Sequence, residues 1–180
     1  MSDAKALLIL HGKQALNSEV REAVKQRREA GWDLAVRVTW EPGDAQRLVR
    51  EASMLGPLFD RDRDVMQVHL GGGTPNFLTP GQIGELLETL SRHFHFSQSP
   101  SRDFSIEIDP RCINKGDIEA LAFMGFNRAS LGVQDFDPAV QAAVNRIQSV
   151  EETNAVIRNC RRSGFRSVNV DLIYGLPLQT

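Results

Sequence analysis

Apolar runs of strand length recur along this chain. The first, Ala6–Leu10, is continuous and apolar before Gly12, which is typical of a strand buried on both faces of a parallel sheet. Residues 34–40 alternate apolar with smaller or polar side chains and predict a second strand. Four further strand patterns follow, at residues 65–70, 104–109, 128–133 and 167–173.

Helical patterns fill the intervals between these strands. A helix is predicted between Ser18, a suitable cap, and Gly31, and a second one has its apolar face over 45–52. Thr79 and Gln82 form a capping box at the start of another helix. The remaining helices are expected around 118–121, after 137–138, and over 150–162.

This alternation predicts a single α/β domain over residues 1–180. About six parallel strands alternate with helices in right-handed β-α-β units, either as a partial (β/α) barrel or as an open flavodoxin-like sheet. In both architectures, ligands bind at the carboxyl ends of the strands.

Composition narrows the classes of function. The 180 residues are 41% hydrophobic and 24% charged, with a formal net charge of −2, so nothing indicates the basic surface that nucleic acids require. The apolar runs are too short to span a bilayer, and the N-terminus lacks the layout of a signal peptide. We expect a cytoplasmic protein whose partner is at most a small molecule, with no nucleic acid and no membrane span.

Polar residues and glycines follow four of the predicted strands. Because the carboxyl ends of parallel strands meet at one edge, we expect these residues to converge. The glycine triplet alone is weak evidence, since it lacks the spacing of a dinucleotide-binding or phosphate-binding loop. The converging residues are Gly71–Thr74, Glu107, Asp109, Gln134, Asp135 and Asp171.

Metal-ligating residues do not form a recognisable motif. The two cysteines, Cys112 and Cys160, are far apart in sequence and are interpreted as free thiols. His69 lies within a predicted strand, where a packed core histidine is the favoured interpretation. We predict no metal site in this chain.

Five motifs then occur in an order that resembles the oxygen-independent coproporphyrinogen III dehydrogenases. They are Val68–Pro75, Ser105–Arg111, Gly132–Phe136, Val144–Arg146 and Asp171–Pro177. These dehydrogenases are radical S-adenosylmethionine enzymes, and the resemblance covers residues 53–180. It implies a segment of a radical S-adenosylmethionine barrel from an enzyme of porphyrin biosynthesis, which decarboxylates two propionate groups of its substrate.

The resemblance also implies cofactor-binding roles. Gly72, Gly73 and Thr74 would line the methionyl end of S-adenosylmethionine, and Glu107 would hold its ribose hydroxyls. Arg146 would bind the cofactor carboxylate, since a guanidinium matches a carboxylate bidentately. The further polar contacts would come from Gln134 and Asp171.

One motif of that family is missing. The family carries three cysteines spaced C-x3-C-x2-C upstream of the glycine loop, and these hold a 4Fe–4S cluster. This chain has no cysteine before Gly71, so we expect the cluster to be absent and the chain to be catalytically inactive.

Residues 5–52 resemble a different family. The segments Leu7–Lys13 and Val36–Ala45 are similar to the start of a bacterial lipid kinase of the diacylglycerol kinase superfamily. We therefore interpret the chain as a composite joined near residues 52–53; an engineered chimera is preferred, and a natural gene fusion is the alternative. Two other functions remain as hypotheses: an ATP-dependent lipid kinase fragment and a non-catalytic folded scaffold. An exposed sheet edge would favour self-association.

Overall fold

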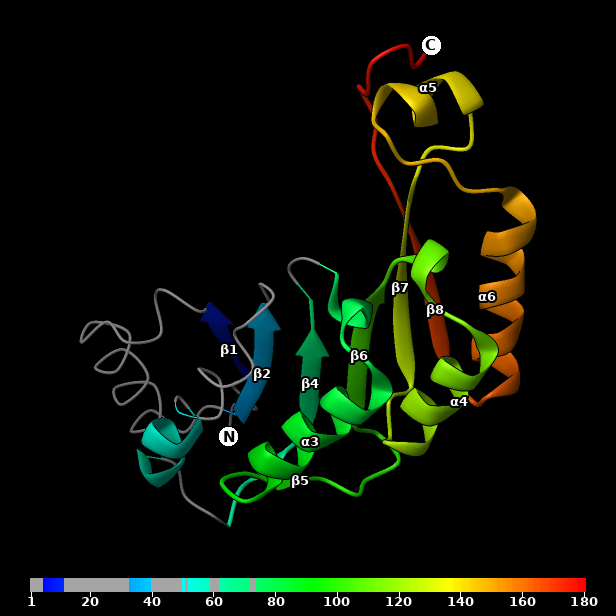
Figure 1. Cartoon of the computed structure of the whole chain (residues 1–180). Coiled ribbons are helices and arrows are strands. Elements are labelled where there is room, and N and C mark those ends of the chain that lie inside the picture. The colour runs from blue at the N-terminus through cyan, green and yellow to red at the C-terminus, as the bar shows by residue number, and fades with distance from the viewer. Residues whose placement is uncertain (1–4, 12–32, 40–49, 51, 59–61, 72–73) are drawn as a thin grey trace. The chain divides into compact units, whose positions relative to one another are not determined.

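The structure is a computed structural model that describes residues 5–11, 33–39, 50, 52–58, 62–71 and 74–180 (Figure 1). The chain divides into two compact units, Met1–Phe104 and Ser105–Thr180, which are described in turn. The junction predicted near residues 52–53 falls within the first unit. Within the described part of the chain, no helix has the length and apolarity that a bilayer span requires.

Among the described residues of the first unit, three parallel strands pair in one sheet. They are β1 (Lys5–His11), β2 (Asp33–Thr39) and β4 (Gln67–Leu70), with β2 paired to both of the others. The sequence pattern over 65–70 predicts one strand, but the structure separates β3 (Asp64–Val65) from β4. β3 pairs with β5 (His95–Phe96), and the Val65 carbonyl accepts a hydrogen bond from the Ser97 amide at 3.1 Å. Because β3 pairs with β5 and not with β2, the predicted strand is interrupted after Val65.

The helix that begins after Thr79 confirms the predicted capping box. In α3 (Pro80–Ser91), Thr79 Oγ1 accepts from the Gln82 amide at 3.3 Å, and Gln82 Oε1 accepts from the Thr79 amide at 2.9 Å. The short η2 (Pro75–Phe77) precedes it. The core-facing residues of α3 are Ile83, Leu86, Leu87 and Leu90.

Two predicted helices fall largely outside the described residues. The one between Ser18 and Gly31 lies wholly outside them, as do 45–49 and residue 51 of the next. Residues 50 and 52–55 are helical and lead into η1 (Gly56–Leu58), and both Ala52 and Leu55 are buried. Continuity of this helix across residue 51 stays a prediction.

The second unit also contains three parallel strands. Most of β6 (Asp103–Ile108) belongs to it, and β7 (Arg128–Gln134) lies between β6 and β8 (Ser167–Leu172). The helical segments are η3 (Pro110–Cys112), α4 (Lys115–Phe123), α5 (Pro138–Ala143) and α6 (Val150–Arg162). The bounds of α6 match the predicted 150–162, and Figure 1 shows α6 beside β8 and α4, both of which it contacts.

The two faces of this second sheet differ in polarity. Ile106, Ile108 and Leu131 are buried on one face, where they form the core with helix residues such as Ile118 and Val156. The alternate positions of β6 and β7 are only partly buried and, apart from Gly132, carry polar side chains. Alternation along each strand therefore creates a polar face opposite the apolar core.

Strand order distinguishes the two predicted architectures. In each unit the middle strand is the middle one in sequence, with β2 between β1 and β4 and β7 between β6 and β8. A flavodoxin-like sheet would place its first strand between the second and third. The α/β prediction of parallel strands alternating with helices is confirmed, and the sequential order within each unit is that of barrel strands.

Candidate functional site

Strand β7 is the centre of a polar cluster in the second unit. Its Ser130 pairs in register with Glu107 of β6, and its Gly132 pairs with Asp171 of β8. The Ser130 hydroxyl lies 2.8 Å from each carboxylate oxygen of Asp171 and donates to that group. The register thus assembles residues from three strands on one face, as the convergence argument predicts.

Arg146 joins this cluster from the loop between α5 and α6. Its Nη2 donates to the Gly132 carbonyl at 2.9 Å and lies 3.3 Å from Asp109 Oδ2. Its Nε is buried and has no hydrogen-bond partner among the described residues. A cationic fork with one unsatisfied buried donor is suited to an anionic ligand.

A buried glutamine pair holds the loop that carries Arg146. Gln141 Nε2 donates to the Gln148 carbonyl at 3.0 Å, and Gln141 Oε1 accepts from the Gln148 amide at 3.2 Å. The Gln141 carbonyl also accepts from the Arg146 amide at 2.8 Å, while Asn145 takes the left-handed conformation with φ 53°. The backbone position of Arg146 is therefore fixed by contacts on both sides of it.

Asp109 forms an ion pair with Arg146 and is 4% exposed. Burial raises the pKa of this carboxyl. Hydrogen bonds from the Arg111 side chain and backbone, together with the charges of Arg146 and Arg111, lower it by more. The pKa of Asp109 therefore lies below its ordinary value. Asp109 is consequently ionised at neutral pH and can hold both guanidinium groups.

The end of β7 carries the next two polar side chains. Gln134 has φ 72°, and its carbonyl accepts from the Ile173 amide at 2.9 Å, which ties β7 to the segment after β8. Asp135 Oδ2 accepts from Gln179 Nε2 at 2.6 Å. A hydrogen bond from the Asp137 backbone and then one from Gln179 lower the pKa of Asp135.

The structure brings together four of the seven predicted site residues. Glu107, Gln134, Arg146 and Asp171 all belong to the β6–β7–β8 cluster of the second unit. Thr74 belongs to the first unit, where it precedes η2 and makes no side-chain capping bond. Gly72 and Gly73 lie outside the described residues.

Three further residues belong to the cluster without having been assigned a cofactor-binding role: Asp109, Ser130 and Gly132. Asp109 was expected among the converging strand-end residues, and its pairing with Arg111 two residues later could not be read from that expectation. Gly132 begins one of the five motifs, but neither its role nor that of Ser130 was predicted, because both depend on contacts with residues distant in sequence.

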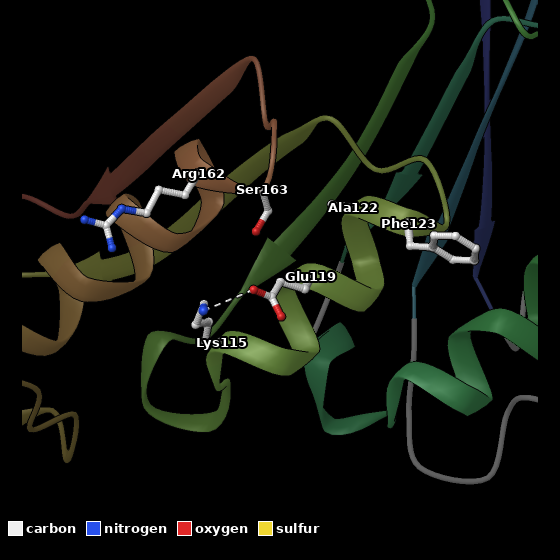
Figure 2. A pocket seen from close by; sticks show the side chains of 6 residues that line it. All are labelled: Lys115, Glu119, Ala122, Phe123, Arg162 and Ser163. Carbon is white, nitrogen blue, oxygen red and sulfur yellow. Dashed lines mark ion pairs between the residues drawn. The ribbon is translucent and has the colours of Figure 1, made fainter.

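A groove elsewhere in the second unit is separate from this cluster (Figure 2). It has a volume of about 520 Å³ and lies along α4 and the end of α6. Lys115 and Glu119 form an ion pair of 3.3 Å within it. It is lined by Lys115, Glu119, Ala122, Phe123, Arg162 and Ser163, none of which belongs to the cluster around β7.

Thiolate ligands are scarce. Of the chain's two cysteines, Cys112 is exposed, whereas Cys160 is buried and burial raises its pKa to about 11. Among the described residues, no group of three His, Cys, Asp or Glu side chains could hold a metal ion.

Comparison with known proteins shows to which protein family this chain belongs. The family model of the radical SAM superfamily matches residues 49–180. The chain belongs to this superfamily. This radical SAM chain is 50% identical over 134 residues, or 74% of its length, to an oxygen-independent coproporphyrinogen III oxidase from Pseudomonas aeruginosa, and 46% identical over 133 residues to the one from Escherichia coli K12. It covers only 29% and 28% of those proteins, respectively.

Solved structures agree with this family. The radical SAM chain resembles HemN, the coproporphyrinogen III oxidase of Escherichia coli, with a TM-score of 0.73 and 34% identity, covering 98% of this chain and 39% of HemN. An archaeal Elp3 from Methanocaldococcus infernus, at 17% identity and a TM-score of 0.51, shares the fold alone. The radical SAM and coproporphyrinogen oxidase resemblances predicted from the sequence are thus confirmed for this part of the chain.

Proposed function

We propose that this chain binds S-adenosylmethionine at the cluster around β7 and does not cleave it. The observation that carries the proposal is Arg146, whose guanidinium contacts Gly132 and Asp109 while its buried Nε has no partner among the described residues. An amino-acid carboxylate is the ligand group that matches this fork.

The remaining residues of the cluster fit the other parts of this cofactor. Glu107 offers carboxylate oxygens to the ribose hydroxyls, and Gln134 and Asp171 offer hydrogen bonds to polar atoms nearby. When bound next to a reduced iron-sulfur cluster, the cofactor would supply a radical; this chain's residues bind and orient it.

An iron-sulfur cluster does not fit the thiols of this chain. Such a cluster is held by three or four cysteine thiolates, and the sequence has two cysteines. Cys160 is buried with its pKa raised to about 11, so it stays a neutral thiol at pH 7. We infer that this chain cannot hold the cluster by itself.

We propose that the chain is a composite joined near residues 52–53, with residues 5–52 from another family, for which the lipid kinases are the candidate. The proposal is supported by the family model, which matches residues 49–180 and not the segment before them. The structural match to HemN, by contrast, covers 98% of the chain.

Titration of the full chain with S-adenosylmethionine and with ATP tests the binding proposal. Isothermal calorimetry should detect the first ligand and not the second, because the described cluster is suited to a carboxylate. Binding of ATP alone would favour the lipid kinase fragment. Binding of neither ligand would favour a non-catalytic scaffold and would overturn the proposal.

Anaerobic reconstitution with iron and sulfide tests the absence of cleavage. We expect no stable cluster, and no 5′-deoxyadenosine after addition of dithionite and S-adenosylmethionine, because the chain lacks a third thiolate. Stoichiometric iron incorporation together with cofactor cleavage would contradict a catalytically silent composite.

A further inference from the structure

We propose that Asp109 is a positioning residue that holds the Arg146 guanidinium in the orientation needed to receive a ligand carboxylate. The inference rests on the S-adenosylmethionine-binding function proposed above and assigns a role to a residue one step removed from the ligand. Asp109 is buried, and Arg146 Nη2 contacts both Asp109 Oδ2 and the Gly132 carbonyl of β7.

Arg111 immobilises the Asp109 carboxylate. Its side-chain Nε donates to Oδ1 at 3.0 Å, its Nη2 donates to Oδ2 at 2.7 Å, and its backbone amide donates to Oδ1 at 3.0 Å. Donors on both oxygens prevent rotation of the carboxylate about its terminal torsion. Oδ2 is therefore presented to Arg146 in a fixed direction.

Arg146 Nη2 is in turn held by one hydrogen bond and one ion pair. It lies 2.9 Å from the Gly132 carbonyl and 3.3 Å from Asp109 Oδ2. This arrangement fixes the plane of the guanidinium and leaves its buried Nε without a partner among the described residues. The rigid fork that results has less conformational freedom to lose when a carboxylate binds.

The charges of these three side chains also favour an anionic ligand. Two guanidinium groups face one carboxylate, so the triad of Asp109, Arg111 and Arg146 carries an excess of one positive charge. Glu107 and Asp171 add carboxylates to the same cluster beside Ser130, so the positive charge is local to the Arg146 end of the site. A ligand carboxylate is therefore expected at Arg146, and the neutral or hydroxyl groups of the ligand near Glu107 and Asp171.

The competing account is that Asp109 only stabilises the fold, because its side chain also accepts from the backbone at the start of η3. Two ligands separate the accounts. S-adenosylmethionine contains the carboxylate, and 5′-methylthioadenosine contains the same nucleoside without the amino-acid group. Asp109→Asn in the full chain should raise the Kd for S-adenosylmethionine about tenfold, the order expected for a charged hydrogen bond, and leave that for methylthioadenosine unchanged.

A double-mutant cycle adds the second readout. In an Arg146→Ala background, Asp109→Asn should have no further effect on the Kd for S-adenosylmethionine, because the residue acts through Arg146. Asp62→Asn, the same chemical change at an exposed turn in the first unit, is the matched control and should alter neither Kd.

If Asp109→Asn fails to fold, Arg111→Lys replaces it. The Arg111 side chain is 33% exposed, so Arg111→Lys should preserve the fold. Lysine keeps the positive charge but cannot form the bidentate contact that Arg111 makes with Asp109. A smaller loss confined to S-adenosylmethionine supports the proposal. Equal losses for both ligands, no loss for either, or additivity with Arg146→Ala would overturn it. A wild-type chain that binds no S-adenosylmethionine would instead refute the proposed function.

Discussion

Gly132→Ala is the substitution that most cleanly separates binding from folding. A Cβ added at this position would lie 2.9 Å from Arg146 Nη2 and 3.2 Å from Gln134 Nε2. Ordinary contacts of a Cβ begin at 3.4 Å, so Nη2 must retreat by about 0.5 Å, the difference between 3.4 and 2.9 Å. That displacement lengthens its 2.9 Å hydrogen bond to the Gly132 carbonyl.

The expected cost to folding is small. Both obstructing atoms end flexible side chains, and neither belongs to the backbone, so β7 itself need not move. Weakening a charged hydrogen bond costs up to about 1.5–3 kcal/mol, while replacing glycine within a strand recovers roughly 0.5–1 kcal/mol. We expect a free energy of unfolding within about 1–2 kcal/mol of wild type.

The expected cost to binding is larger, because Arg146 can no longer present the same fork to a carboxylate. Calorimetric titration should show a Kd for S-adenosylmethionine about tenfold higher, with urea unfolding measured on the same samples. Gly81→Ala is the control, because an added Cβ there meets only Thr79 Oγ1, at 3.8 Å. Unchanged affinity in Gly132→Ala would refute the assigned role of the Arg146 contact, as would an equal loss in Gly81→Ala.

Three further predictions concern the second unit. Arg146→Ala should weaken S-adenosylmethionine binding, whereas Arg161→Ala, on the exposed side of the last turn of α6, should not; equal Kd values in calorimetry would speak against the site. Because its folded pKa is lowered, ionised Asp109 contributes stability above its ordinary pKa of 3.8 that is lost as pH falls through the folded value. Urea unfolding should therefore find Asp109→Asn less stable than wild type at pH 7, with a gap that closes in acid, and a gap independent of pH would argue otherwise. Finally, β8 pairs on one edge with β7 and exposes Leu172 to 61%, so light scattering should detect concentration-dependent self-association; a strict monomer would contradict it.

Local patterns in the sequence predict much of the fold. The capping box at Thr79 and the bounds 150–162 of α6 follow from side chains within a few residues of each helix end, so no distant contact was needed to predict them. The division of 65–70 into β3 and β4 depends instead on pairing between Val65 and Phe96. Periodicity carries no information about such a partner.

Prediction of the candidate site is limited in the same way, because local patterns do not reveal partners that are distant in sequence. Strand-end positions identify Glu107, Gln134 and Asp171 because parallel strands bring their carboxyl ends together. Asp109 and Gly132 gain their roles from Arg146, which lies far from both in sequence. An aspartate before a proline and a glycine within a strand have common local explanations, so only the folded structure reveals these contacts.

Hydrogen–deuterium exchange of the full chain, with and without S-adenosylmethionine, tests the central claim most directly because it reports where the ligand binds. The account predicts slower exchange in peptides covering 105–111, 130–135, 144–148 and 169–173, which carry the cluster around β7. Peptides covering the groove along α4 and the end of α6 should be unchanged. Protection confined to that groove, or no protection anywhere at a saturating ligand concentration, would contradict the assignment of S-adenosylmethionine to this site.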